Sequence, residues 1–171
     1  MSAIRYLKFA VAGGHGAGKT TFIQAASDSL VVTSAGAYGR TDSSGDMDYA
    51  TVTINSALVL SLFGTEKPCP EDFLWQILIE GMHGLIVLVD STQPARFADA
   101  RAALQILTFA PVPYLVAANK QDIPGAQSPE TIRTALALDT TVKILPCVAR
   151  TKDAVKAVVL ELATPILETL K

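Results

Sequence analysis

The chain has 171 residues, of which 50% are apolar and 18% are charged. This composition excludes a disordered or fibrous protein, and the length predicts one domain over residues 1–171 with a core that needs no structural metal or disulfide. With 14 basic and 16 acidic side chains, the formal net charge is −2, so we expect no broad basic face for nucleic acid. The two cysteines fit no metal-binding spacing, which favours a reducing, cytoplasmic setting.

Nothing in the chain predicts a direct membrane anchor. The longest apolar runs, such as residues 85–89, are far shorter than the roughly 20 residues that span a bilayer. Residues 1–5 lack the apolar stretch of a secretory signal, and Ser2 stands where N-myristoylation requires glycine. We therefore expect that any contact with a membrane is made through a partner.

Apolar runs alternate with helical patterns along the whole chain. Strands are predicted over residues 6–12, 50–54, 57–63, 85–89, 114–118 and 143–147. Continuous runs such as 85–89 indicate strands buried on both faces of a mostly parallel sheet. Asn55 and Ser56 form a predicted hairpin turn, which makes the second and third strands antiparallel.

The helical patterns lie between these strands. Helices are predicted over residues 19–27, 70–80, 95–110, 129–136 and 153–167. Ser128 as N-cap and Pro129 at the first helical position mark the start of the fourth helix. The order of elements predicts an α/β fold: a three-layer α/β/α sandwich with a six-stranded, mostly parallel sheet, one antiparallel edge strand and five helices. Ligands of such sheets bind outside the carboxyl ends of the strands.

A glycine-rich loop joins the first predicted strand to the first predicted helix. Its sequence, GGHGAGKT over residues 13–20, matches G-x-x-x-x-G-K-[ST], in which backbone N–H groups curl around a phosphate and the helix N-terminus adds positive potential. Lys19 is expected to bridge the β- and γ-phosphates, and Thr20 to ligate Mg²⁺. The residues predicted to hold the phosphates are Gly13, Gly14, His15, Gly16, Ala17, Gly18, Lys19, Thr20 and Thr21.

His15 is the unusual member of this loop. Two interpretations stay open for it: a solvated loop histidine, or a side chain that leans toward the γ-phosphate and alters the space for an attacking water. The second interpretation predicts turnover that varies with pH in the range where histidines titrate.

A second motif, NKQD at residues 119–122, follows the predicted strand 114–118. The Asp122 carboxylate is placed to accept hydrogen bonds from N1–H and the 2-amino group of guanine, two donors that adenine lacks. Asn119 is expected to tie this loop to the phosphate loop, and the stem of Lys120 to cover the base. N-K-x-D alone is a weak pattern, but directly after a strand and well downstream of a phosphate loop it is a strong one.

Together these motifs resemble the Ras-like small GTPases over essentially the whole chain. Residues 119–126, NKQDIPGA, look like the Arf branch, whereas residues 62–65, LFGT, with 73–75, FLW, look like bacterial Ras-like GTPases related to MglA and the conservon-encoded group. The resemblance implies a P-loop NTPase fold, binding of GTP or GDP with Mg²⁺, and a signalling switch. The stretch Cys147, Val148, Ala149 and Arg150 also resembles the family's last base-contacting loop, which implies that the Ala149 backbone N–H faces guanine O6.

The departures from the family pattern lie where hydrolysis is carried out. The family has D-x-x-G after the third strand, often followed by a glutamine that orients water. Here Gly64 aligns with the Asp, Lys67 with the Gly and Pro68 with the Gln. Pro68 has no side chain that hydrogen-bonds a water, and together with Pro70 it stiffens the segment.

Other parts of the catalytic apparatus have more than one candidate. Glu66 and Glu71 would position water, or they are solvated loop carboxylates. In switch I, Ser44 aligns with the family threonine that senses Mg²⁺ and the γ-phosphate, and Thr41 competes with it. Arg40 is either a solvated arginine or a finger that stabilises the transition state in cis, as in the Gα proteins.

We interpret the chain as a guanine-nucleotide switch with slow, partner-dependent GTP hydrolysis. One alternative is a scaffold that holds GTP or GDP without turnover, favoured by Pro68 and the missing D-x-x-G. Another is a P-loop nucleotide kinase or ATPase, favoured if Asp90, at the end of a strand, holds the metal instead of starting a loop. The resemblance also implies a Roadblock-type protein, a GTPase-activating protein or an exchange factor as partner, with Phe73 and Trp75 either a partner surface or part of the core.

Overall fold

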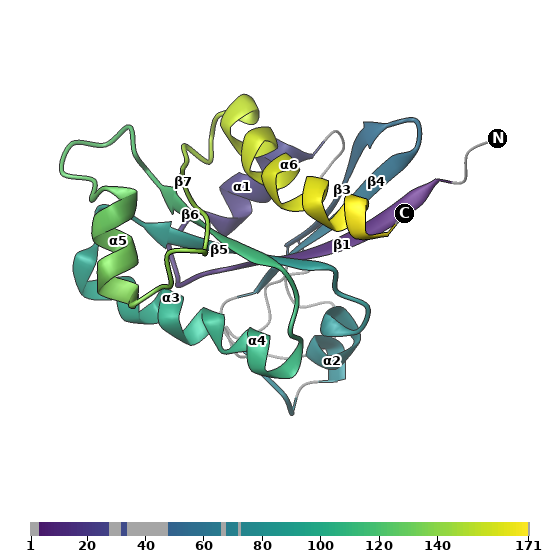
Figure 1. Ribbon diagram of the computed structural model, residues 1–171, viewed down its shortest axis with the longest axis horizontal. Coiled ribbons are helices and arrows are strands. Elements are labelled where there is room, and N and C mark those ends of the chain that lie inside the picture. The colour runs from purple at the N-terminus through teal and green to yellow at the C-terminus, as the bar shows by residue number, and fades with distance from the viewer. Residues whose placement is uncertain (1–3, 28–31, 34–47, 66–67, 72, 171) are drawn as a thin grey trace.

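A twisted sheet runs through the molecule with helices on both of its faces (Figure 1). The computed structural model describes residues 4–27, 32–33, 48–65, 68–71 and 73–170. Over these residues the strands lie in the order β2-β3-β4-β1-β5-β6-β7, with β3 antiparallel to β2 and β4 and the other pairs parallel. Their bounds are β1 Arg5–Ala12, β2 Val32–Thr33, β3 Asp48–Asn55, β4 Leu58–Thr65, β5 Gly84–Asp90, β6 Tyr114–Asn119 and β7 Ile144–Pro146.

The α/β class and the six predicted strands are confirmed, and the sheet gains the two-residue strand β2, which is too short to leave a sequence pattern. The predicted hairpin exists, but its turn was placed one residue early. β3 includes Asn55, and the turn is formed by Ser56 and Ala57. Asn55 Oδ1 accepts a hydrogen bond from Ala57 N at 2.8 Å, so the asparagine at the end of β3 stabilises the turn that follows it.

Helix bounds follow the predictions closely at some ends and not at others. They are α1 Lys19–Ala26, α2 Phe73–Ile79, the 3₁₀ helix Pro94–Arg96, α3 Phe97–Leu104, α4 Ile106–Phe109, α5 Pro129–Leu136 and α6 Lys152–Thr169. The single helix predicted over 95–110 was wrong, because Gln105 separates α3 from α4 although the apolar spacing continues on both sides of it. α2 begins at Phe73, later than predicted, and the Pro70 carbonyl accepts a hydrogen bond from Gln76 Nε2 at 2.6 Å.

Two hydrophobic cores, one on each face of the sheet, hold these layers together. α1 and α6 cover one face, above the sheet in Figure 1, while α2, α3, α4 and α5 pack on the opposite side. The residues of α6 that point into the first core are Val155, Val158, Val159, Leu162, Ala163 and Ile166. Burial on both faces explains the uninterrupted apolar run of β5, whose residues 84–89 are all buried.

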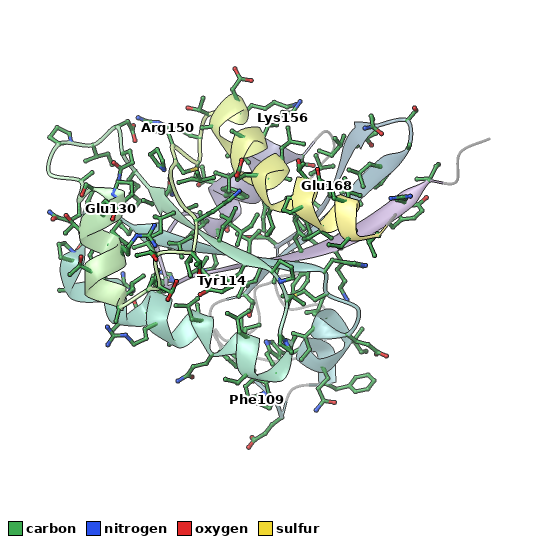
Figure 2. The ribbon with its side chains drawn as sticks, in the orientation of Figure 1. Phe109, Tyr114, Glu130, Arg150, Lys156 and Glu168 are labelled. Atoms are coloured by element: carbon green, nitrogen blue, oxygen red, sulfur yellow. The ribbon has the colours of Figure 1, made fainter. Side chains whose placement is uncertain are left out.

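The two aromatic residues at the start of α2 have opposite environments. Trp75 is 5% exposed and meets Phe109 of α4 edge-on, with ring centroids 5.4 Å apart; Phe109 is labelled at the end of α4 in Figure 2. Phe73 is 73% exposed. Trp75 therefore belongs to the second core, and Phe73 is left at the surface. Among the described residues, no helix has both the length and the apolar character needed to cross a bilayer.

Candidate functional site

The glycine-rich loop leaves the carboxyl end of β1, at the centre of the sheet, and enters α1. Lys19 folds back across it: Nζ donates hydrogen bonds to the carbonyl oxygens of Gly13 and Gly14, each at 2.9 Å. Gly18 takes a φ of 102°, and a Cβ built there would lie 2.4 Å from Asn119 Nδ2. The loop thus brings an ammonium group over its own backbone and lies against the motif at the end of β6.

Asn119 joins three loops. It ends β6, is 2% exposed, and donates from Nδ2 to Ala17 O at 2.8 Å. Its Oδ1 accepts the Ala149 N–H at 2.9 Å. The expected tie between the phosphate loop and the NKQD loop is therefore present, and the same amide also holds the loop that follows β7. A buried amide with both of its ends paired fixes the relative positions of its partners.

Lys120 adds a second link between the same loops. Its backbone has a φ of 65°, and Nζ donates to Gly16 O at 3.0 Å and to Asp90 Oδ2 at 2.6 Å. Burial raises the pKa of Asp90, but hydrogen bonds from Lys120 and Thr92 outweigh this, so that the pKa of Asp90 lies below its ordinary value. The Asp90 carboxylate thus pairs with Lys120 of the NKQD motif and with Thr92, neither of which lies beside Thr20 in the sequence.

A pocket of about 160 Å³ opens between these loops. It is lined by Gly18, Thr21, Asn119, Lys120, Asp122, Ile123, Val148, Ala149 and Arg150. Asp122 faces Arg150 across this pocket, and the Arg150 guanidinium donates to Asp122 Oδ2. Figure 2 labels Arg150, which precedes α6 on the connection from β7. The pocket combines a carboxylate with apolar side chains, which is the chemistry that a flat base with a polar edge needs.

The other three residues of the predicted last loop, Cys147, Val148 and Ala149, contribute in different ways. Val148 and Ala149 line the pocket. The Ala149 N–H, which was predicted to face guanine O6, donates instead to Asn119 Oδ1. Cys147 is buried and acts through its backbone, since its N–H donates to Ala118 O at 2.9 Å and its carbonyl accepts Gln121 N at 3.3 Å. Burial raises the pKa of the Cys147 thiol to about 11, so the thiol stays protonated at neutral pH.

Thr20, at the start of α1, has a partner that the sequence did not predict. Its Oγ1 donates a hydrogen bond to Oδ2 of Asp48, the first residue of β3, which is 8% exposed. The register of β3 on β4 explains this contact. Tyr49 lies opposite Phe63, so one step further along the ladder Asp48 lies beside Gly64.

Not all of the other predicted site residues fall within the described part of the chain. Arg40, Thr41, Ser44, Glu66 and Lys67 lie outside the described residues. Of those that are described, His15 and Glu71 are exposed and Pro68 is half-buried. Gly64 is buried at the end of β4, where the family pattern has a carboxylate.

No role was predicted for Asp48 from the sequence, and Arg150 was predicted to lie in the last base-contacting loop but not to pair with Asp122. For Asp48 the signal was the hairpin, but a regular ladder from the Asn55–Leu58 pair would have put Tyr49 opposite Gly64. The bulge between Thr53 and Asn55 shifts the register by one residue and brings Asp48 there instead.

The donor set around Thr20 fits a magnesium ion. A hydroxyl and a carboxylate are hard oxygen ligands of the kind that Mg²⁺ takes, and this ion usually keeps waters and phosphate oxygens as its other ligands. Over the described residues, no group of three or more His, Cys, Asp or Glu side chains is arranged to hold a metal by itself. Thr20 and Asp48 would therefore hold Mg²⁺ only together with a phosphate-bearing ligand.

Comparisons with known proteins agree with this geometry. Residues 2–166 match the model of the ADP-ribosylation factor family. The chain is 30% identical over 141 residues to the human ADP-ribosylation factor-related protein 1, an alignment that covers 78% of this chain and 68% of that protein. It is 40% identical over 63 residues to the small COPII coat GTPase SAR1 of Giardia intestinalis, which covers 34% of this chain and 33% of the relative.

A solved structure shares the fold over nearly the whole chain. It is the Arl6 BBS3 small GTPase of Trypanosoma brucei with a bound nucleotide analogue, GppNp, with a TM-score of 0.73 and 18% identity over 96% of this chain and 99% of that one. These comparisons do not confirm the finer resemblance to bacterial MglA and conservon-type proteins. The chain belongs to the ADP-ribosylation factor family of small GTPases, guanine-nucleotide switches that bind GTP and GDP with Mg²⁺ and hydrolyse GTP.

Proposed function

We propose that the pocket beside Asp122 takes the guanine base, and that the loop ending in Lys19 and Thr20 takes the phosphates and Mg²⁺. The observation that carries this assignment is the position of Asn119, whose amide pairs with Ala17 of the phosphate loop and with Ala149 of the base pocket. The two subsites are thereby held at a fixed separation. Asp122 would accept the two donors of the guanine edge, which adenine lacks.

Competition between GDP and ADP for the purified protein tests this assignment. Because hydrogen bonds to charged groups are worth about 1.5–3 kcal/mol each, wild type should prefer GDP by about 100-fold. Asp122→Asn should remove most of that preference, and Lys19→Ala should weaken both nucleotides together. Asp153→Asn, which removes an exposed carboxylate on α6, is the matched control and should behave as wild type. Equal affinity of wild type for GDP and ADP would contradict the proposal.

We further propose that GTP hydrolysis by the chain alone is slow. Support comes from Pro68, which has no hydrogen-bonding side chain where the family often has a water-orienting glutamine. In single-turnover measurements we expect a rate far below the roughly 1 s⁻¹ of partner-activated GTPases. Should phosphate release from wild type be no faster than from Lys19→Ala, the chain acts instead as a scaffold that holds nucleotide without turnover.

We propose that a regulatory protein, either of the Roadblock type or an activating or exchange factor, supplies what the chain lacks. The sequence LFGT at residues 62–65, which looks like the bacterial group, supports a Roadblock-type partner, and the exposed side chains of Phe73 and Ile77 on α2 offer it an apolar contact. Single-turnover hydrolysis with and without a candidate partner tests this. Acceleration in wild type should be lost in Phe73→Asp while nucleotide affinity is retained.

The kinase or ATPase interpretation has no observation in its favour. It depended on Asp90 holding the metal, but that carboxylate accepts hydrogen bonds from Lys120 and Thr92. The nucleotide recovered from the purified protein, guanine or adenine, distinguishes the two interpretations directly.

A further inference from the structure

We infer that Asp48, on β3, supplies the carboxylate that orients Mg²⁺ and its ligand Thr20, in place of the acidic residue that the family pattern has at the end of β4, where this chain has Gly64. The inference rests on the proposed binding of a Mg²⁺–nucleotide. Three observations carry it: the hydrogen bond between Thr20 and Asp48, the register of the β3–β4 ladder, and the space beside Gly64.

The hydrogen bond sets the direction of the Thr20 hydroxyl. Because Thr20 Oγ1 donates its hydrogen to Asp48 Oδ2, the oxygen lone pairs are left for another partner. A hydroxyl that donates to a carboxylate is a stronger ligand for a cation, and such outer partners orient metal ligands and tune their affinity. P-loop GTPases use a serine or threonine together with an aspartate for this purpose.

The ladder explains how a carboxylate from a different strand reaches the same place. β4 is parallel to β1, with Gly64 paired to Val11, so Gly64 lies immediately beside the start of the phosphate loop. β3 runs antiparallel to β4, and Asp48, its first residue, lies at the same edge of the sheet. Asp48 is 8% exposed, and a buried carboxylate is retained where it is paired or coordinates a cation.

The space beside Gly64 is the third observation, because it indicates that a carboxylate fits at residue 48 or at residue 64 but not at both. A Cβ built on Gly64 would lie 3.6 Å from Asp48 Cβ and 3.8 Å from Asp48 Oδ2. An aspartate at residue 64 would therefore bring its charge against that of Asp48, and two like charges so close together are costly. The carboxylate of Asp48 is thus compatible with a glycine at residue 64 and not with a second carboxylate there.

Exchanging the two positions provides the test. The measurement is the rate at which a fluorescent GDP leaves the purified full-length protein, first with millimolar Mg²⁺ and then with a chelator. Wild type should release GDP much faster once Mg²⁺ is removed. Asp48→Ala and the isosteric Asp48→Asn should release it about 10- to 100-fold faster than wild type with Mg²⁺ present, and at a rate close to wild type in the chelator.

The double variant Asp48→Ala/Gly64→Asp should recover slow release in Mg²⁺, because it moves the carboxylate to the neighbouring strand. Its Cβ would meet Ile23 Cδ1 at 3.3 Å, the flexible end of a side chain. Asp48→Ala/Gly64→Asn has the same size without the charge and should not recover it. The isosteric Asp48→Asn keeps the test valid if the alanine variants unfold.

Two results would overturn the inference: Asp48→Asn with the Mg²⁺ dependence of wild type, or equal release from the Gly64→Asp and Gly64→Asn double variants. Both differ from failure of the proposed function, in which wild type itself would not bind GDP, or would release it at the same rate with and without Mg²⁺.

Discussion

Arg150 and Asp122 form an ion pair across the pocket that we assign to the base. The Arg150 side chain is 72% exposed, whereas that of Asp122 is 27% exposed. The carboxylate that we propose to read guanine is therefore partly neutralised by a residue at the rim. An exposed pair of this kind stabilises the protein by about 0–1 kcal/mol.

This pairing predicts the effect of removing the arginine. In Arg150→Ala, guanine no longer competes with the guanidinium for Asp122, so we expect GDP to bind up to about fivefold more tightly. The gain should shrink as salt is added, because salt weakens the exposed pair in wild type. Titration calorimetry at two ionic strengths measures both effects. Weaker binding by the variant would show that Arg150 holds the base rather than competing with it.

Gly18→Ala is expected to separate the phosphate loop from the NKQD loop. The new methyl group would lie 2.4 Å from Asn119 Nδ2, and the φ of 102° disfavours any side chain. We expect a loss of roughly 2–4 kcal/mol in the free energy of unfolding, from clash and strain together, and loss of GDP binding. Gly81→Ala is the matched control, since it has a φ of 67° with nothing within 4 Å, and it should cost only the strain of about 1 kcal/mol. Similar losses in both variants would contradict the proposed clash.

We expect the ionised Asp90 carboxylate to make a pH-dependent contribution to the free energy of unfolding. Its pKa is lowered in the folded protein, so the carboxylate stabilises the fold above its unfolded pKa of about 3.9, and this contribution is lost as the pH falls through the folded pKa. Asp90→Asn should therefore lower the free energy of unfolding by about 1 kcal/mol at pH 7 and by less near pH 3. Urea denaturation at both pH values measures this.

The control for Asp90 is another carboxylate in an ion pair. Glu130 pairs with Arg133, but its side chain is 78% exposed, compared with 14% for Asp90. Glu130→Gln should change stability little at either pH. An equal effect of the two substitutions at pH 7 would show that burial of the Lys120–Asp90 pair adds nothing.

Trp75 offers a direct measure of how far α2 moves between nucleotide states. It is the one tryptophan in the chain, and it is buried against Phe109. Lys8 Nζ holds the end of α2 by donating to the carbonyls of Ile77 and Glu80, each at 2.9 Å. With Pro68 and Pro70 stiffening the segment before it, α2 should move little, so tryptophan emission should be nearly the same with GDP and a GTP analogue. A large shift in the emission maximum would contradict a rigid α2.

The sequence predicted best those features that depend on local patterns. α5 has the predicted bounds because Ser128 caps it, accepting Thr131 N at 3.2 Å, and Pro129 starts it. The phosphate loop and the NKQD motif likewise have fixed spacings that carry their chemistry. The α/β class followed from the alternation of strands and helices along the chain.

Features that depend on contacts between distant elements were not predictable in the same way. The place of Asp48 depends on a bulge of one residue in the hairpin, which leaves no pattern of its own. The separation of Trp75 from Phe73 depends on where α4 lies, since both residues are large, aromatic and near the start of one helix. The break at Gln105 lies inside a continuous apolar spacing.

The position of Asn119 has a consequence for how bound nucleotide leaves. One side chain amide spans Ala17 and Ala149, so neither the loop around the phosphates nor the wall of the base pocket can shift without straining the other. Release should then proceed as a joint loosening of both ends of the ligand. A protein that accelerates exchange would need to displace only one of these loops to free the whole molecule.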